Sequence, residues 1–339
     1  MNMDIKLSFI VPFYNVEKYI GACLDSLYAQ DIQEEEYEVI CVDDCSPDNS
    51  KSIVRKYQKQ HSNLVLIEHP YNKGLGAARN IGMNAARGKY LWFIDSDDLV
   101  YSNVLSNVFS KFIVNNPDVI LFNYERVNRT GELIDEGIVF EDSVCQSGRD
   151  FVKSYFGDGL IYHLGYVWRC VYRTEYLKKN NFVFPENCYW EDTVFFPKTI
   201  LYADKVISLT KVFYKYRVND DSISGKINKY KAERYYQFSF VTGKVLFDFS
   251  QEYMQVDKEL ASALKKKSIW YFNSFTKPLA FSNYTEKRRF YTIFNQNKAQ
   301  ITDIINYITP RNRILLNPFW GLLLSYLFRI AYSIKDKTK

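Results

Sequence analysis

Short apolar runs alternate with amphipathic stretches through the first 123 residues, and no other feature constrains the fold as strongly. The apolar runs lie at 7–12, 37–43, 64–69, 90–95 and 118–124, and the helical stretches near 16–30, 49–60, 75–87 and 102–115. Short unbroken strands followed by amphipathic helices are typical of a mostly parallel sheet covered by helices on both faces. Ligands bind such sheets outside the carboxyl ends of the strands, so functional residues are expected just after each strand.

The rest of the chain follows a different pattern. Residues 124–147 carry turn signals between alternating segments, which predicts a hairpin or an excursion from the sheet. The elements predicted next are helices around 166–179 and from about 191 to 203, and a strand near 205–217. Beyond residue 225 the pattern is helical to the end, with breaks at Pro278, Pro310 and Pro318. The predicted fold class is therefore α/β with a helical C-terminal extension.

The net charge of +5 is concentrated at one end of the chain. Residues 310–339 carry six Lys or Arg against one Asp, so the remainder of the chain is neutral. A neutral body with one basic end argues against nucleic-acid binding, which would require a basic face on the folded domain. It indicates one local anionic partner.

Cysteine, histidine and the N-terminal run indicate the cellular compartment. The chain has six Cys without C-x-x-C spacing and three His, which predicts reduced thiols and no His-based metal site. The first apolar run is broken by Pro12 and lacks a small-residue cleavage site, so it predicts a strand and no signal peptide. A cytoplasmic location is expected.

Each of the first four predicted strands runs into a polar motif. These motifs are Val11-Pro12-Phe13-Tyr14-Asn15, Asp43-Asp44-Cys45-Ser46, residues 72–80 and Asp95-Ser96-Asp97-Asp98. Any one of them alone could be a helix cap or a capped turn. Four polar strand ends on one rim are much harder to explain as caps, so this rim is predicted to bind a ligand.

The last of these motifs predicts a metal. Three carboxylates within four residues repel one another unless a cation or solvent relieves them. Oxygen-only ligands with no His nearby select Mg²⁺ or Mn²⁺, which keep waters and bridge to substrate phosphates. Asp95 and Asp97 cannot enclose an ion alone, so a bound diphosphate would complete its coordination.

The third motif supplies positive charge for such a diphosphate. It contains Lys73 and Arg79 and the turn Gly74-Leu75-Gly76, which allows close backbone approach at a helix N-terminus. As a dinucleotide fingerprint it is poor, because it reads G-x-G-x-x-R and follows the third strand, which argues against a nicotinamide dehydrogenase.

Four motifs in order carry a family resemblance. SFIVPFYN, VDDCSPDNS, NKGLGAARNIGMNAARGKYLWFIDSDD and YWEDTVF resemble the family 2 glycosyltransferases of the GT-A fold, which make bacterial surface polysaccharides. The match is close over residues 5–123, patchier through about 225 and weak beyond. The resemblance implies a GT-A type domain that transfers a sugar from a nucleoside diphosphate.

The resemblance also implies roles for single residues. Pro12, Tyr14 and Glu17 match positions that contact the nucleotide, and Asp43 and Asp44 match the acidic pair that reads the base, usually uracil. The positions that match the loop over the base and phosphates are Lys73, Gly74 and Arg79. Asp95-Ser96-Asp97 matches the D-x-D motif, in which Asp97 is the metal ligand and Asp95 lies nearer the ribose and the metal waters.

On the acceptor side, Glu191 and Asp192 resemble the family's E-D element at the start of a helix. Inversion needs a group that takes the proton of the acceptor hydroxyl, and Asp192 is the predicted general base, positioned by Glu191. The alternative is two acidic residues placed favourably in a helix's first turn. Trp168 and Arg169 match the region that lines the acceptor cleft, with a core Trp as the alternative.

Arg217 falls in a stretch that resembles the family's closing loop, where a cation covers the diphosphate. The loop continues through Asn219 to Ser224, but the chain has Asp220-Asp221 in a stretch where family members often carry His. This departure weakens the assignment of Arg217 as a phosphate contact.

The last thirty residues predict an amphipathic helix. The uncharged run Ile314 to Phe328 is 15 residues long, short of the ~20 needed to span a bilayer. Apolar residues at helical spacing, flanked by Lys and Arg, fit a helix on an anionic inner leaflet, while the alternative is a helix docked on the protein's own core or on a partner. The protein is therefore expected to be peripheral on the inner face of the cell membrane.

These expectations combine into one function. The predicted segments are 1–123 for the nucleotide sugar, 124–225 for the acceptor, 226–309 as a helical region and 310–339 as the membrane-associating helix. The function is inverting, metal-dependent transfer of a sugar, with UDP as the expected nucleotide, to a hydroxyl of a glycan or lipid-linked acceptor. The alternative is an inactive nucleotide-sugar or glycan-binding module, against which the intact Asp95, Asp97 and Asp192 argue. A sugar-1-phosphate nucleotidyltransferase would need a Gly-rich basic loop after the first strand, which this chain lacks.

Overall fold

The computed structural model describes residues 5–137, 140–143, 146–156, 166–186, 190–218, 236–275, 279 and 283–316. The predicted break at Pro278 lies outside these ranges. The chain divides into two compact units, Met1–Ser222 and Ile223–Lys339, and each is described by itself.

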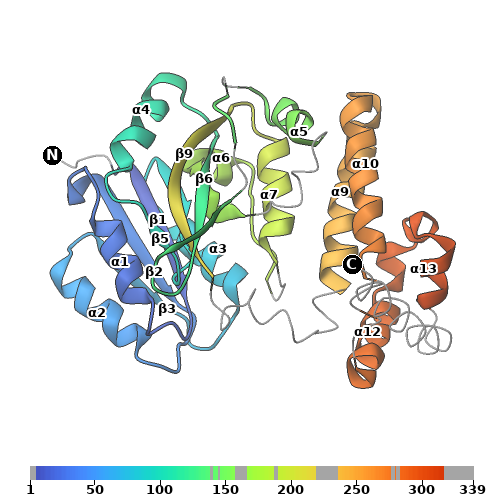
Figure 1. The fold of residues 1–339 in the computed structure, drawn as a ribbon, viewed down its shortest axis with the longest axis horizontal. Coiled ribbons are helices and arrows are strands. Elements are labelled where there is room, and N and C mark those ends of the chain that lie inside the picture. Colours follow the sequence, from blue (N-terminus) through green and yellow to red (C-terminus); the bar gives the residue numbers. More distant parts are fainter. Residues whose placement is uncertain are drawn as a thin grey trace. The chain divides into compact units, whose positions relative to one another are not determined.

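The first unit is built around one nine-stranded sheet (Figure 1). Its strands are β1 (Leu7–Phe13), β2 (Tyr37–Asp43), β3 (Leu64–Glu68), β4 (Tyr90–Phe93), β5 (Leu99–Val100), β6 (Val119–Val127), β7 (Leu133–Glu136), β8 (Cys170–Arg173) and β9 (Val206–Arg217). They lie in the order β3-β2-β1-β4-β8-β6-β9-β5, and β7 pairs with β6. Because β3, β2, β1 and β4 are parallel, as are β6 and β9, the predicted mostly parallel sheet is confirmed.

Helices cover both faces of the parallel strands. They are α1 (Ile20–Tyr28), α2 (Ser50–Gln60), α3 (Leu75–Ala85) and α4 (Leu105–Asn115), at the four predicted stretches. Phe9 of β1 faces one side, in a core cluster with Leu24 of α1 and Leu105 of α4. Ile10 faces the other side, so close to α3 that a Cβ at Gly82 would lie 2.4 Å from its side chain. This double cover explains why every residue of β1 is buried.

The predicted helix around 166–179 is wrong over much of its length. Val167–Arg169 form a 3-10 turn (η3), Cys170–Arg173 form β8, and only Thr174–Lys179 form a helix, α6. β8 inserts between β4 and β6 and pairs antiparallel with both. Its sheet neighbours are distant in sequence, and burial between them outweighs the local helical pattern.

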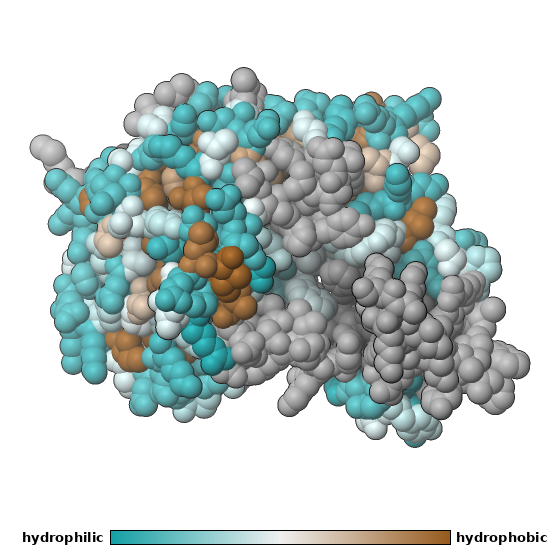
Figure 2. Space-filling view, in the orientation of Figure 1, coloured by the Kyte–Doolittle hydropathy of each residue, from teal (hydrophilic) through white to brown (hydrophobic). Residues whose placement is uncertain are grey.

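The other predicted elements of the first unit are confirmed. β6 and β7 form a hairpin whose turn falls in the predicted segment 124–147. α7 (Asp192–Leu201) and β9 match the helix and strand predicted near 191–203 and 205–217. The unit is completed by η1 (Glu34–Glu36) and α5 (Gly148–Phe156). In the view of Figure 2 the described surface is mostly hydrophilic, with hydrophobic residues in small patches.

The second unit is helical in its described part. Its elements are the π-helical turn η5 (Gln237–Val241), α9 (Thr242–Glu252), η6 (Tyr253–Gln255), α10 (Lys258–Asn273), α12 (Tyr284–Gln296), η7 (Lys298–Ile301), η8 (Ile305–Tyr307) and α13 (Pro310–Leu315). Aromatic side chains such as Phe240, Phe272 and Phe290 fill its core. None of the helices that the structure describes is long and apolar enough to cross a membrane.

The predicted membrane-associating segment 310–339 is only partly described. Pro310 is the first residue of α13, where its fixed φ suits a helix start. Asn312 and Leu316 are buried in the second unit. The first residues of the segment therefore belong to this unit's own core, while residues 317–339 lie outside the described part.

A glycine at the start of α3 allows a neighbouring loop to approach closely. A Cβ at Gly76 would lie 2.4 Å from the carbonyl oxygen of Pro185, a backbone atom that no side-chain rotation can move. We expect Gly76→Ala to lower the free energy of unfolding by about 1–3 kcal/mol, the usual cost of overpacking. Thermal and urea unfolding measure the change.

Gly21 of α1 is the matched control. A Cβ there would meet its nearest atom at 3.8 Å, an ordinary contact. Gly21→Ala should therefore stabilise the protein by about 0.5 kcal/mol through better helix propensity. If both substitutions changed the free energy of unfolding in the same direction, the close approach of Pro185 would not be the reason for glycine at position 76.

Candidate functional site

Polar motifs gather at the carboxyl ends of the parallel strands. Phe13, the last residue of β1, pairs with Asp43, the last residue of β2. The Asp44 N–H donates to the Phe13 carbonyl oxygen at 3.0 Å. The N–H of Ile94, the residue after β4, donates to the Ile10 carbonyl oxygen at 2.8 Å. The motifs that follow β1, β2 and β4 therefore lie on one edge of the sheet.

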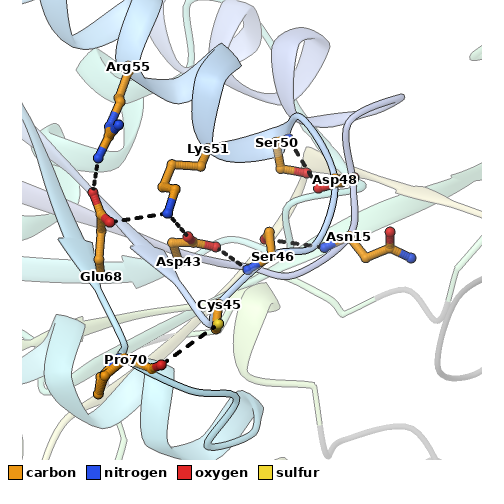
Figure 3. Close-up of polar contacts among 10 residues, drawn as sticks. All are labelled: Asn15, Asp43, Cys45, Ser46, Asp48, Ser50, Lys51, Arg55, Glu68 and Pro70. Atoms are coloured by element: carbon orange, nitrogen blue, oxygen red, sulfur yellow. Dashed lines mark hydrogen bonds and ion pairs between the residues drawn. The ribbon is translucent and has the colours of Figure 1, made fainter.

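Asp43 is enclosed at this edge (Figure 3). Its Oδ1 accepts a hydrogen bond from the Ser46 N–H at 2.8 Å. Its Oδ2 has no hydrogen-bond partner among the described residues and lies 3.7 Å from Lys51 Nζ, which also contacts Glu68 at 3.3 Å. The cation of Lys51 therefore offsets the charge of a buried carboxylate, a role that the sequence analysis did not identify.

Asp44 shapes the loop that follows β3. Its two carboxylate oxygens accept hydrogen bonds from the N–H groups of Lys73 and Gly74, each at 2.8 Å. Gly74 has φ 89°, in the left-handed region that favours glycine, and forms the N-cap of α3. His69, itself buried, lies with Nδ1 2.8 Å from Asp44 Oδ1 and holds the carboxylate in place. His69 was also missed from sequence.

Arg79 joins two acidic motifs that are far apart in sequence. One guanidinium nitrogen donates to Asp95 Oδ1 at 2.7 Å, and another donates to Glu191 Oε1. Arg79 is 2% exposed and Glu191 4%. Burying these charges is tolerable because they are paired and hydrogen-bonded. The structure thus fixes Asp95, two residues after β4, against the start of α7.

The last two aspartates of the 95–98 motif have different surroundings. Asp98 is fully buried, where Oδ2 accepts from the Tyr214 hydroxyl at 2.8 Å and Oδ1 from the Arg217 N–H at 2.7 Å. No side chain of the described residues donates to Asp97, and burial, followed by the charge of Asp95, raises the pKa of Asp97 to about 6. Asp98 therefore fastens the motif to β9, while Asp97 is left for a ligand.

Asp192 begins α7 inside the protein. Its Oδ1 is buried without a hydrogen-bond partner among the described residues. Burial, and then the charge of Glu191, raises the pKa of Asp192 well above its usual range, and Arg79 opposes this only in part. A carboxylate with a raised pKa and a free oxygen is a stronger proton acceptor than a surface aspartate.

Exposed and cationic side chains surround this edge. Tyr14 is 47% exposed, and Lys73 Nζ lies 5.4 Å from the centroid of the Tyr71 ring. Arg217, at the end of β9, is buried, lies 5.3 Å over the Tyr19 ring, and its Nε has no hydrogen-bond partner among the described residues. The side chains of Tyr14, Lys73 and Arg217 are therefore available to contact a ligand. The rest of the predicted closing loop, from Asn219 to Ser224, lies outside the described residues.

Three further predicted residues serve the local structure. Pro12 and Ser96 are buried in β1 and in the turn after β4. Glu17 Oε2 accepts from the N–H and the side-chain amide of Asn49, both at 3.0 Å. Glu17 thus ties the loop before α1 to the start of α2.

The predicted cleft residues Trp168 and Arg169 belong to the core. Trp168 stacks against Tyr214 and Tyr166, with ring centroids 4.5 Å and 5.0 Å apart. Arg169 is 0% exposed and lies 4.1 Å over the Phe140 ring. The expectation that they line a cleft is wrong because aromatic packing encloses both, and the core alternative for Trp168 is correct. This stack supports Tyr214, which holds Asp98.

Asp95 and Asp97 suit a hard divalent cation as two of its ligands. Carboxylate oxygens are the ligands that Mg²⁺ and Mn²⁺ prefer, and the pKa of Asp97 is raised first by burial and then by the nearby charge of Asp95. The described residues contain no group of three His, Cys, Asp or Glu side chains that could hold a metal. A cation here would therefore need further oxygens from a diphosphate and water.

Comparisons with known proteins identify a family and related sequences. The family model "Glycosyl transferase family 2" matches residues 8–179. The chain is 32% identical over 68% of its length to a poly(ribitol-phosphate) beta-glucosyltransferase of Bacillus spizizenii, covering 35% of that protein. It is 31% identical over 64% of its length to the uncharacterized glycosyltransferase EpsJ of Bacillus subtilis, covering 62% of it. The chain thus spans from about a third to under two thirds of these relatives.

A solved structure resembles the chain over almost its full length. The crystal structure of residues 1–349 of S. aureus TarS in complex with UDP has a TM-score of 0.68 and 25% identity, covering 98% of this chain and 92% of that one.

Proposed function

The chain belongs to glycosyl transferase family 2 and has the predicted GT-A type fold, and from this premise we propose that it transfers a sugar from a nucleoside diphosphate to a hydroxyl group. UDP is the proposed nucleotide, because the TarS structure was solved with UDP and the chain carries the matching acidic residues Asp43 and Asp44. The proposed acceptor is a glycan or lipid-linked saccharide used in cell-surface polysaccharide synthesis.

The buried guanidinium of Arg79 is the observation that carries this proposal. It fixes Asp95 on the donor side to Glu191 on the acceptor side, so that donor and acceptor groups share one rigid site. Groups that must meet at one reacting bond need such fixed geometry. A helix cap or an isolated turn would not require a buried guanidinium that bridges two distant segments.

Asp192 is the proposed general base. It takes the proton of the acceptor hydroxyl as that oxygen attacks the anomeric carbon from the face opposite the leaving diphosphate, so the product is inverted. Its raised pKa suits this step, and Glu191, held by Arg79, keeps the start of α7 in place.

Asp97 and Asp95 are the proposed residues for Mg²⁺ or Mn²⁺. When bound, the cation neutralises charge on the leaving diphosphate. Lys73 and Arg217 supply further positive charge, and the Gly74 turn allows the loop to approach the phosphates. Tyr14 is proposed to pack on the nucleotide base, and its exposed ring supports this role. Pro12, Ser96 and Glu17 shape the strand and loops that carry these contacts.

Nucleotide binding tests the donor assignment. We expect isothermal titration calorimetry with Mn²⁺ to show UDP binding at least about tenfold tighter than GDP or CDP, because a base-reading carboxylate pair discriminates by hydrogen bonding. Equal affinity for all three nucleotides would remove Asp43 and Asp44 from base recognition. An inactive binding module would bind UDP as well, so activity must decide between the two functions.

The C-terminal segment is proposed to hold the protein on an anionic inner leaflet, near a lipid-linked acceptor. Because Asn312 and Leu316 are buried in the second unit, the deletion that tests this begins at residue 317. A protein lacking 317–339 should keep its donor hydrolysis and its melting temperature but lose co-sedimentation with anionic vesicles. Binding of the full chain should weaken with salt, since each basic residue adds ~1 kcal/mol at such a surface. Equal vesicle binding by both forms would contradict the membrane role.

A further inference from the structure

A hollow of about 780 Å³ lies at the edge of the sheet opposite the proposed active site. Its walls are the segments just before β4 and β6 and just after β8, which are the amino ends of two parallel strands and the end of an antiparallel neighbour. The hollow is separated from Asp95 by β4 and the residue after it. This separation is a distance of roughly 15–20 Å, at ~3.3 Å per strand residue. The hollow is therefore not part of the donor site.

Basic side chains dominate the walls. The charged residues that line the hollow are Arg87, Lys89, Arg173, Lys178, Lys179 and Glu175. Only one of the six is acidic. Such a concentration of positive charge in a concave surface raises the local concentration of anions.

Buried carboxylates hold the side chains of Arg87 and Arg173, the two arginines in the lining. Glu38, 1% exposed, accepts from Arg87 Nε at 2.9 Å and from the Arg87 N–H at 2.7 Å. Asp118, 3% exposed, accepts from an Arg173 guanidinium nitrogen. Arg173 Nε is buried and has no hydrogen-bond partner among the described residues. The guanidinium groups are thus held in fixed orientations, with at least one donor unused.

The lysines supply the uncompensated charge. Glu38 and Asp118 pair with Arg87 and Arg173, and Glu175 Oε2 lies 3.3 Å from another guanidinium nitrogen of Arg173. Three carboxylates thus offset three of the five positive charges in the lining, and two positive charges remain. Lys89, Lys178 and Lys179 are all exposed, and Lys178 Nζ donates to the Ala86 carbonyl oxygen at 2.9 Å, which fixes its position. An excess of two charges matches a phosphate monoester dianion.

We propose that this basic hollow is a second ligand site, which binds the phosphate group of a phosphorylated compound. Its volume lies within the ~300–1,000 Å³ typical of small-molecule sites and exceeds what one phosphate needs, so the body of the ligand also fits. The oriented guanidinium groups supply directional hydrogen bonds, and the lysines supply charge.

Calorimetry with inorganic pyrophosphate in the presence of a chelator tests the proposal on the full-length protein. The test variant is Lys89→Ala with Lys179→Ala, and the matched control is Lys56→Ala with Lys59→Ala, which removes the same charge from exposed positions on α2. We expect the test variant to bind pyrophosphate about tenfold more weakly than the wild type, and the control to bind within twofold. Equal binding by the two variants, or no binding by the wild type at millimolar pyrophosphate, would overturn the proposal.

A substitution that removes a negative charge from the lining gives an independent check, because it should strengthen pyrophosphate binding. Among the described residues that line the hollow, the exposed Glu175 is the one acidic side chain, so Glu175→Gln should bind pyrophosphate about two- to fivefold more tightly. Donor hydrolysis should be unchanged in the Lys89/Lys179 and Glu175 variants, since these residues are distant from Asp95. Weaker binding by Glu175→Gln would contradict attraction of an anion to the hollow.

Vesicle flotation distinguishes the source of the phosphate. If the ligand is a lipid headgroup, loss of Lys89 and Lys179 should reduce flotation of the protein with phosphatidic acid vesicles. Flotation with phosphatidylcholine vesicles should be unchanged. If the ligand is soluble, flotation should be the same in the test and control variants while pyrophosphate binding differs. Both results support a phosphate site, and loss of flotation without loss of pyrophosphate binding would overturn it.

Discussion

Asp192→Asn is expected to lower kcat by about 10²–10⁴-fold, the usual contribution of a general base, while nucleotide affinity stays nearly intact. The amide matches the carboxylate in shape but cannot take a proton from the acceptor hydroxyl. Stability should not fall, because the substitution removes a buried charge whose Oδ1 has no partner among the described residues. Transfer to an acceptor mimic, UDP binding and thermal melting together measure the effect.

The control separates the base from its positioning residue. Glu191→Gln weakens the ionic bridge to Arg79, so it should lower both kcat and thermal stability. If Asp192→Asn also lost nucleotide affinity and melted at a lower temperature, Asp192 would be structural or on the donor side, and Glu191 would become the candidate base.

The pH dependence of kcat follows from the same carboxylate. Asp192 must be ionised to accept a proton, so kcat falls as pH drops through its pKa. Because burial and Glu191 raise that pKa, the acidic limb should lie above the usual aspartate range near pH ~4. A wild-type profile that stays flat down to pH ~4, or the same acidic limb in Asp192→Asn, would assign the titration to another group.

Asp97→Ala should abolish detectable transfer and weaken Mn²⁺-dependent donor binding by roughly 10²–10³-fold. The reason is that the diphosphate loses the carboxylate that holds its bridging cation, an interaction worth several kcal/mol. Donor binding measured with Mn²⁺ and with a chelator shows the loss directly, since the variant should bind equally weakly in both. A variant that keeps full activity in chelator would remove the metal from the mechanism.

Its neighbour Asp98 is the matched comparison. The Asp98 carboxylate is already satisfied by the Tyr214 hydroxyl and the Arg217 N–H, so Asp98→Asn should change stability more than metal dependence. Should Asp98→Asn lose the response to Mn²⁺ while Asp97→Ala keeps it, the two aspartates would have to exchange roles.

The sequence predicted the features that depend on local patterns. Strands such as 37–43 and helices such as 49–60 follow from short runs of buried residues and amphipathic spacing, and these local signals also located the motifs at the strand ends. The parallel half of the sheet was predictable because strands and helices alternate there, and β1, β2 and β3 lie beside one another in chain order.

Contacts between distant segments could not be predicted. β8 is a strand because it lies between β4 and β6, and its own residues fit a helical pattern as well. The bond from Tyr214 to Asp98 and the bridge from Arg79 to Glu191 each join residues more than a hundred positions apart. No pattern along the chain marks such partners, so the sequence analysis gave Asp98 no role of its own and assigned Arg79 to the loop over the base and phosphates.

Hydrolysis of nucleotide sugars is the decisive test of the proposed transfer reaction. The full-length protein is incubated with a panel of UDP-, GDP- and CDP-sugars and Mn²⁺, and release of the nucleotide is followed by chromatography. We expect release of UDP from at least one UDP-sugar, loss of this release in chelator and in Asp97→Ala, and no release of nucleotide from the GDP- and CDP-sugars. Failure to release nucleotide from any sugar donor, with or without an acceptor glycan, would contradict a transferase and leave a binding module.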